Sequence, residues 1–268
     1  MLKKSAMPLS KATAAQPSVK RNCPPEEWHA RVDLACAYRV FHHLGWHNLI
    51  YNHITLRIPG PERNFLINPF GLLYEEVTAS NLVKVDLEGN KIDASSHDIA
   101  QAGYVVHSSV HRYREDVMCV MHTHTNAGVA VACQPGGLLP LDIQSSIFAG
   151  KITYHDLEGV TLETSESDRI ARNLGDSNTM ILRNHGLLAC GPTVAETFHE
   201  LHLLEKCCQV QLAIQSSGVP PIPIPPEVQR KIAAQSDMRN SPRLKKNAKL
   251  QWAAMRRRMD ALDPTYAN

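Results

Sequence analysis

The sequence has little of what marks a membrane, secreted or nucleic-acid-binding protein. No apolar run approaches the roughly 18 residues that a membrane-spanning helix needs, and we expect no secretory signal segment at the N-terminus. The formal net charge is only +2 over 268 residues, which gives no argument for a nucleic-acid partner. The seven cysteines are odd in number and form no CxxC pair, as expected for free thiols in the cytoplasm.

The pattern of apolar residues divides the chain into three parts. Residues 1–25 contain no acid and five basic residues, and we expect residues 1–24 to form a disordered tail. Residues 25–218 alternate helical spacing with strand and hairpin patterns, which predicts one layered α/β or α+β domain. Residues 219–268 begin with the proline-rich linker "VPPIPIPP" and continue as a basic amphipathic helix. Its apolar stripe is expected to dock on this domain or on a neighbouring subunit.

Histidine is abundant, with 14 copies, and two of them end an apolar strand pattern in "DVMCVMHTHTNAGVA". Side chains alternate along a strand, so His122 and His124 project from the same face about 7 Å apart. Two such imidazoles can hold one divalent ion if the fold supplies a third ligand. His185 in "LRNHGLL" is the best candidate, because it also follows an apolar strand and precedes a glycine. Three neutral imidazoles leave positions open for water and substrate.

Five sequence blocks occur in an order that resembles the class II aldolase/adducin family over roughly residues 28–215. These blocks are "NHITLR", "INPFGLLYEEVTASNLVKVD", "QAGYVVHSSVH", "CVMHTHTNAGVAV" and "LRNHGLLACGPTVAETF". The resemblance implies a three-layer α/β/α domain with a mainly antiparallel sheet, and a homotetramer with active sites between subunits. It also implies a metal site on His122, His124 and His185, with zinc, iron, manganese or cobalt as the ion.

The chain departs from the family's sugar-phosphate aldolases where they have an acid/base glutamate. Aligning His107 with the family's helix histidine places Gly103 at the glutamate position. Phe70 replaces a small hydroxyl residue, and Gln101 and Ala102 fall where a serine pair is expected. A phosphate would therefore be poorly held, and we expect an unphosphorylated substrate.

Other side chains could replace the missing acid/base group. His53, His107 and Tyr113 are the candidates for proton transfer, with His111 one turn beyond His107. The expected substrate-binding residues lie in the two loops that match the family, and they are Asn52, Thr55, Asn68, Phe70 and Gly71.

Three functional hypotheses follow from these residues and the resemblance. The first is a metal-dependent lyase that makes or breaks a carbon–carbon bond beside a carbonyl of a small hydroxy-carbonyl substrate. The second is a non-haem Fe(II) oxygenase acting on an aromatic or 2-oxo/2-hydroxy acid, which needs no glutamate. The third is a non-catalytic, adducin-like interaction module with a cytoskeletal partner. The retention of all three histidines favours an enzyme over the third hypothesis.

Overall fold

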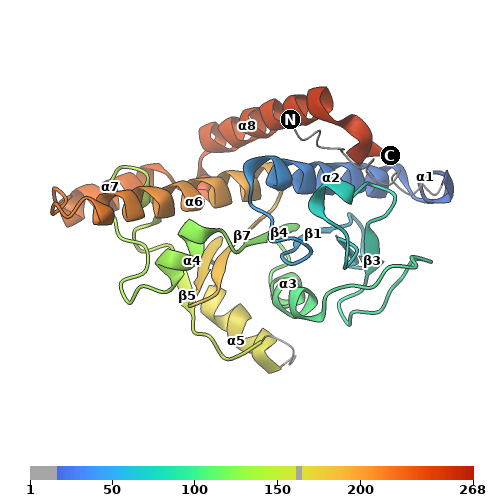
Figure 1. The fold of residues 1–268 in the computed structure, drawn as a ribbon, viewed down its shortest axis with the longest axis horizontal. Coiled ribbons are helices and arrows are strands. Elements are labelled where there is room, and N and C mark those ends of the chain that lie inside the picture. The colour runs from blue at the N-terminus through green and yellow to red at the C-terminus, as the bar shows by residue number, and fades with distance from the viewer. Residues whose placement is uncertain (1–16, 161–164) are drawn as a thin grey trace, which may run out of the picture.

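A seven-stranded mixed sheet forms the centre of the protein in a computed structural model that describes residues 17–160 and 165–268 (Figure 1). The strand order is β3-β2-β1-β4-β7-β6-β5, and every neighbouring pair is antiparallel except β5 and β6. The strands are β1 (Ile54–Arg57), β2 (Phe65–Ile67), β3 (Val83–Val85), β4 (Cys119–Thr123), β5 (Thr153–His155), β6 (Thr179–Leu182) and β7 (Gly186–Gly191). The predicted α/β class with a mainly antiparallel sheet is confirmed.

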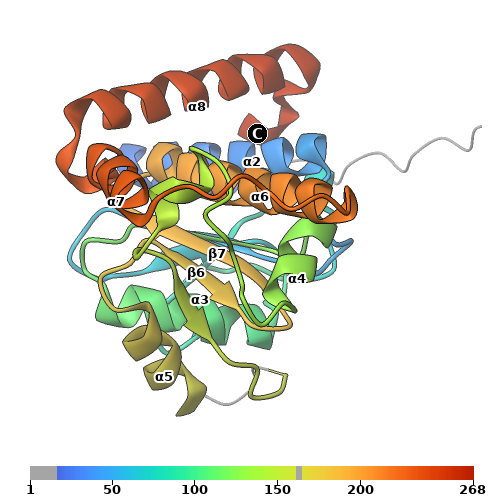
Figure 2. The same cartoon turned by 90° about the vertical axis from the view of Figure 1, so that its left-hand side faces the viewer.

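Helices lie against both faces of this sheet (Figures 1 and 2). Alternate residues of β4 show why: Cys119 and Met121 pack in a core with α2 and α6, whereas Val120 packs in a second core with α3 and α5. The helices are α1 (Pro17–Asn22), α2 (Pro25–Leu44), α3 (Gln101–Tyr113), α4 (Asn126–Ala132), α5 (Ser165–Leu174), α6 (Val194–Ser216), α7 (Pro226–Gln235) and α8 (Pro242–Leu262). Short 3-10 helices are η1 (Tyr74–Glu76), η2 (Ser145–Phe148), η3 (Met238–Asn240) and η4 (Pro264–Ala267).

Strand register brings distant segments to one edge of the sheet. Ile54 at the start of β1 pairs with Met121, so the residues just before β1 lie beside the end of β4. β2 ends next to the start of β1, and β7 begins opposite the end of β4, where Thr123 pairs with Leu187. Residues 52–53, 68–71, 122–124 and 185 therefore meet at this edge.

The C-terminal helix α8 docks on the domain of its own chain. Ala248, Trp252 and Met259 of the predicted apolar stripe are buried, and the Trp252 ring lies 5.5 Å from that of Phe198 on α6. An ion pair between Arg256 and Asp33 on α2 adds a polar contact. No helix among the described residues is long and apolar enough to cross a membrane.

The helix α6 is capped at its N-terminus and followed by a glycine at its C-terminus. The Thr193 hydroxyl accepts a hydrogen bond from the Glu196 amide at 3.1 Å, and Gly218 beyond the helix has a positive φ of 70°.

At the N-terminus, residues 1–16 of the predicted disordered tail lie outside the described residues. Residues 17–22 of that tail form the short helix α1, where Lys20 lies over the Trp28 ring.

All seven cysteines are free thiols, as the sequence predicts, and their exposure differs sharply. Five of them are buried, and burial raises the pKa of Cys36, Cys190 and Cys207 to about 12. Cys133, at the end of α4, is exposed. The buried thiols are therefore core residues rather than nucleophiles.

Candidate metal centre

Two neighbouring chain segments position the three predicted ligands. His122 is the fourth residue of β4, His124 follows the strand directly, and His185 lies in the turn between β6 and β7. That turn depends on Asn184, which has a positive φ of 56° and whose amide donates to the carbonyl of Ala132 at 3.1 Å. Gly186 is required because a Cβ there would lie 2.2 Å from the Thr123 carbonyl oxygen.

The imidazoles converge through their Nε2 atoms. The His122 Nε2 lies 2.7 Å from that of His124 and 3.2 Å from that of His185. Two nitrogens bound tetrahedrally to one ion at about 2.05 Å are separated by about 3.3 Å, so small ring rotations would fit all three to a metal. The Nδ1–H of His122 donates to the Leu187 carbonyl at 2.8 Å, which leaves the lone pair on its Nε2. These residues fit a single divalent ion.

Burial favours the form of these histidines that binds metal. It lowers the pKa of His122 well below its ordinary value, and the neighbouring imidazoles of His124 and His185 add to the effect. Burial also lowers the pKa of His124 and brings that of His185 to about 4. All three rings are therefore neutral at physiological pH, with lone pairs available for coordination.

His53 fills the space that a side chain at position 103 would need. A Cβ built on Gly103 would lie 1.7 Å from Cδ2 of His53 and 2.1 Å from its Nε2. The His53 ring stacks on His107 at 5.7 Å and meets the His122 ring edge-on at 6.5 Å. Both ring nitrogens of His53 are buried without a hydrogen-bond partner among the described residues. Such atoms are rare in proteins, and here they lie next to the triad.

Behind the ring of His107, a hydrogen-bonded cluster of Thr55, His107 and His111 lies in the interior. The Thr55 hydroxyl lies 2.8 Å from His107 Nδ1 and 2.8 Å from His111 Nε2, so it donates to one ring and accepts from the other. Thr55, which the sequence places with the substrate, thus has two internal partners and is fully buried. Burial keeps the pKa of His107 well below its ordinary value and lowers that of His111 to about 3.

We expect the buried His111 to make the protein sensitive to acid. Because its pKa is about 3 in the folded protein and about 6.5 in the unfolded chain, only the unfolded chain binds the proton between these values. Stability should therefore fall as the pH drops below 6.5, by about 1.4 kcal/mol per pH unit for one such group. In urea unfolding between pH 7 and 5, His111→Gln should show a shallower loss than the wild type. Replacing the exposed His43 with glutamine is the control, and an unchanged slope in His111→Gln would contradict this account.

Of the other predicted substrate-binding residues, Asn52 and Asn68 are buried, whereas Phe70 and Gly71 lie at the surface. Asn68 is buried and its Oδ1 accepts from the Tyr38 hydroxyl at 2.9 Å, so it supports the loop from inside. Asn52 is also buried, with a positive φ of 79° and no partner for its Oδ1 among the described residues. Gly71 lies at the surface, and the Phe70 ring is 40% exposed, 6.5 Å from the exposed ring of Tyr51. This aromatic pair, of which Tyr51 was not predicted, lies at the same sheet edge as the triad.

Tyr113 is not brought to the triad within one chain. It is the last residue of α3, and α3 leads into the opposite end of β4 from His122. Its ring is exposed and its hydroxyl donates to Asp168 of α5 at 2.5 Å. A role for Tyr113 in proton transfer stays a prediction, and it would require the site of a neighbouring subunit.

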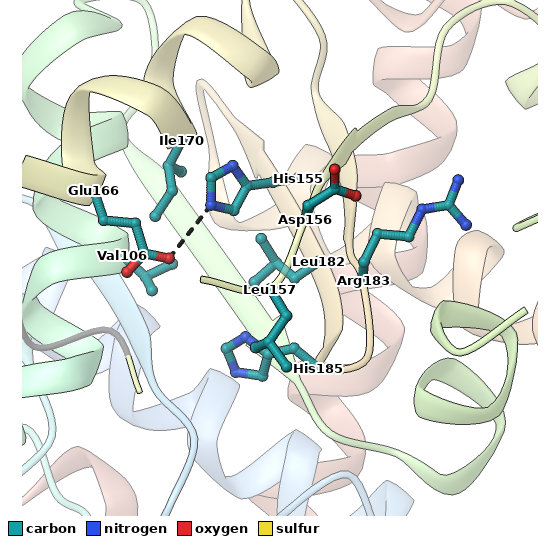
Figure 3. A pocket seen from close by; sticks show the side chains of 9 residues that line it. All are labelled: Val106, His155, Asp156, Leu157, Glu166, Ile170, Leu182, Arg183 and His185. Atoms are coloured by element: carbon teal, nitrogen blue, oxygen red, sulfur yellow. Dashed lines mark hydrogen bonds and ion pairs between the residues drawn. The ribbon is translucent and has the colours of Figure 1, made fainter. Parts of the chain in front are cut away.

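A small cavity beside His185 contains two residues that the sequence analysis missed, His155 and Glu166 (Figure 3). The Asn173 amide donates to His155 Nδ1 at 2.8 Å, so His155 donates from Nε2 to Glu166 at 3.3 Å. Arg183 also lines the cavity, but its guanidinium lies over the Tyr154 ring, 4.2 Å from the centroid, and turns away from His185. The motif "TYHD" gave no spacing signal that could have identified His155.

The comparisons with known proteins agree with this geometry. Residues 32–212 match the family model described as the class II aldolase and adducin N-terminal domain. The chain belongs to this family. A relative from Pseudomonas aeruginosa, named as an aldolase class 2 protein with its activity left provisional, is 46% identical over 90% of this chain and 92% of its own length. Rat alpha-adducin is 44% identical over 71% of this chain, which spans only 26% of adducin.

Solved structures of the family share the fold. An aldolase II superfamily protein from Pseudomonas syringae aligns with a TM-score of 0.87 and 43% identity, covering 93% of this chain and 99% of that one. The L-fuculose 1-phosphate aldolase of Glaciozyma antarctica aligns with a TM-score of 0.77 and 27% identity, covering 91% and 96%. The family thus includes both an aldolase and a protein named for the adducins.

Proposed function

We propose that the protein is a divalent-metal-dependent lyase-type enzyme that makes or breaks a carbon–carbon bond in a small, unphosphorylated hydroxy-carbonyl compound. The observation that carries the proposal is the convergence of three neutral imidazoles beside the unpaired nitrogens of His53. A bound divalent ion would supply Lewis-acid polarisation of a carbonyl group. Fold relatives that include an L-fuculose 1-phosphate aldolase support the lyase class.

The protein's own side chains have separate roles in this proposal. His122, His124 and His185 hold the ion, and the neutral His53 offers an N–H or a lone pair to a substrate oxygen in place of the family glutamate. His107 stacks on His53 and fixes its ring plane. Phe70 and Tyr51 present aromatic surface, and Arg183 points away from the triad, so the edge offers no evident clamp for a phosphate.

We expect metal-loaded protein to cleave unphosphorylated hydroxy-ketones faster than their phosphorylated counterparts. The experiment loads the chain with zinc, manganese or cobalt and measures release of the carbonyl fragment. The preference should be at least about tenfold, and His124→Ala should lower turnover by about 100-fold or more. The matched control is His199→Ala, a histidine on α6 that bonds to Gln251 far from the triad. Metal-loaded protein without turnover on any of these compounds would contradict the lyase proposal.

The adducin relative gives specific support to a second candidate, a non-catalytic interaction module. That candidate predicts that replacing His124 leaves partner binding unchanged and that no compound is turned over. The Fe(II) oxygenase stays a prediction, as do the homotetramer and the cytoplasmic location.

A further inference from the structure

A second cavity of about 370 Å³ lies at the opposite edge of the sheet from the triad. It opens beside Thr153 and Thr179, the first residues of β5 and β6, whereas the metal site lies beyond the other ends of β6 and β4. Its outer wall is the segment from Ser236 to Arg239, which follows α7, and α7 packs against η2 (Figure 2). The volume is in the range of small-molecule sites in proteins.

Two acidic residues of the lining, Asp176 and Glu200, have carboxylates without a hydrogen bond or ion pair among the described residues; Asp176 is exposed, whereas Glu200 is partly buried. Glu200 of α6 lines the cavity, and no hydrogen bond or ion pair joins its carboxylate to another group in the described part of the chain. Burial raises the pKa of Glu200 to about 7, while the charge of Lys151 acts to lower it. A partly buried carboxylate of this kind is stabilised when a cation comes to it.

Two basic groups on the same wall keep unused donors. Lys151 donates to the Ala233 carbonyl, which engages one of its three N–H groups. Arg239 uses two of its groups, donating to the Asp176 carbonyl at 3.2 Å and pairing with Asp237 at 3.5 Å. Its remaining donors can bind a carboxylate. Ile147, Phe148 and Met238 provide apolar surface between these charges.

We propose that this cavity binds a small amino acid, with its ammonium group at Glu200, its carboxylate at Lys151 and Arg239, and its carbon chain against the apolar residues. A ligand with only one charge would pair either with Glu200 or with Lys151 and Arg239, but not with both. The site is independent of the metal centre and of the proposed lyase activity.

Isothermal titration calorimetry of the full chain at pH 8 tests the proposal. The probes are ω-amino acids from glycine to 6-aminohexanoate, with butylamine and butyrate as single-charge controls. One chain length should bind at least tenfold more tightly than either control, and Glu200→Gln and Arg239→Gln should each weaken it at least tenfold. Glu227→Gln, on the first turn of α7 away from the cavity wall, should bind as the wild type does.

Several results would overturn the proposal. These are absence of binding at millimolar concentrations, equal binding by Glu200→Gln, and tighter binding of butylamine than of every amino acid. The His124→Ala variant separates the two sites, because it should lose metal and keep amino-acid binding. Loss of amino-acid binding in His124→Ala would place the ligand at the metal centre and refute the second site. Glu200→Gln removes a partly buried charge that has no ion pair, so it should fold, and Arg239→Gln provides an independent test.

Discussion

Replacing His122 with alanine should abolish metal binding. Its Nε2 is the central one of the three ligand nitrogens, within 3.2 Å of both others. Without it, only two imidazole ligands remain for the ion. Bound metal should fall from near one ion per chain to less than about a tenth, because a divalent ion held by two neutral ligands exchanges readily with water. Elemental analysis of protein purified anaerobically without added metal measures this directly.

The same elemental analysis needs a control variant for the metal content, and the identity of the bound ion separates the two enzyme hypotheses. His199→Ala removes an imidazole on α6 and should retain the wild-type metal content. Full occupancy in His122→Ala would refute the assigned centre. Iron in the wild type would favour the oxygenase hypothesis, whereas zinc, manganese or cobalt would favour the lyase.

Replacing Gly103 with alanine should destabilise the protein, although alanine favours helices. The helix propensity gained inside α3 is about 0.5–1 kcal/mol. Against this, the new methyl group would lie 1.7 Å from the buried His53 ring and force it to move, and such overpacking costs about 1–3 kcal/mol. The clash should therefore exceed the gain, and the free energy of unfolding in urea should fall.

A double-mutant cycle isolates the contact between Gly103 and His53. His53→Ala removes the ring, so adding Gly103→Ala to it should stabilise the chain instead of destabilising it. The coupling between the two substitutions should reach about 1 kcal/mol or more. Additive effects would show that the ring does not occupy this space. The variant Gly103→Glu combined with His53→Gly then tests whether a carboxylate from α3 can replace the imidazole of the residue just before β1.

The clustering of His122, His124 and His185 could be predicted from the sequence because its signal is local. Alternation along a strand places His122 and His124 on one face, and the glycine after His185 indicates a tight turn. The amphipathic character of the C-terminal helix was predictable for the same reason, since an apolar stripe depends on spacing within a few residues.

Contacts between distant segments could not be predicted in this way. Nothing near position 53 indicates that its ring occupies the space beside position 103, because 50 residues, which include the strands β1 to β3 and the 3-10 helix η1, separate them. The match to a family loop predicted a role for Thr55 at the substrate, yet its hydroxyl is shared by His107 and His111. Tyr113 was a candidate proton donor, and only the direction of α3 shows that it lies at the far edge of the sheet.

The contrast between one exposed cysteine and five buried ones makes the protein selectively labelable. A maleimide dye should react fastest at Cys133, because the buried thiols are shielded and hold their protons. Cys133 directly follows Ala132, whose carbonyl holds the turn that carries His185. A fluorophore there would sit one residue from that contact, so its emission could report metal binding in real time without any known substrate.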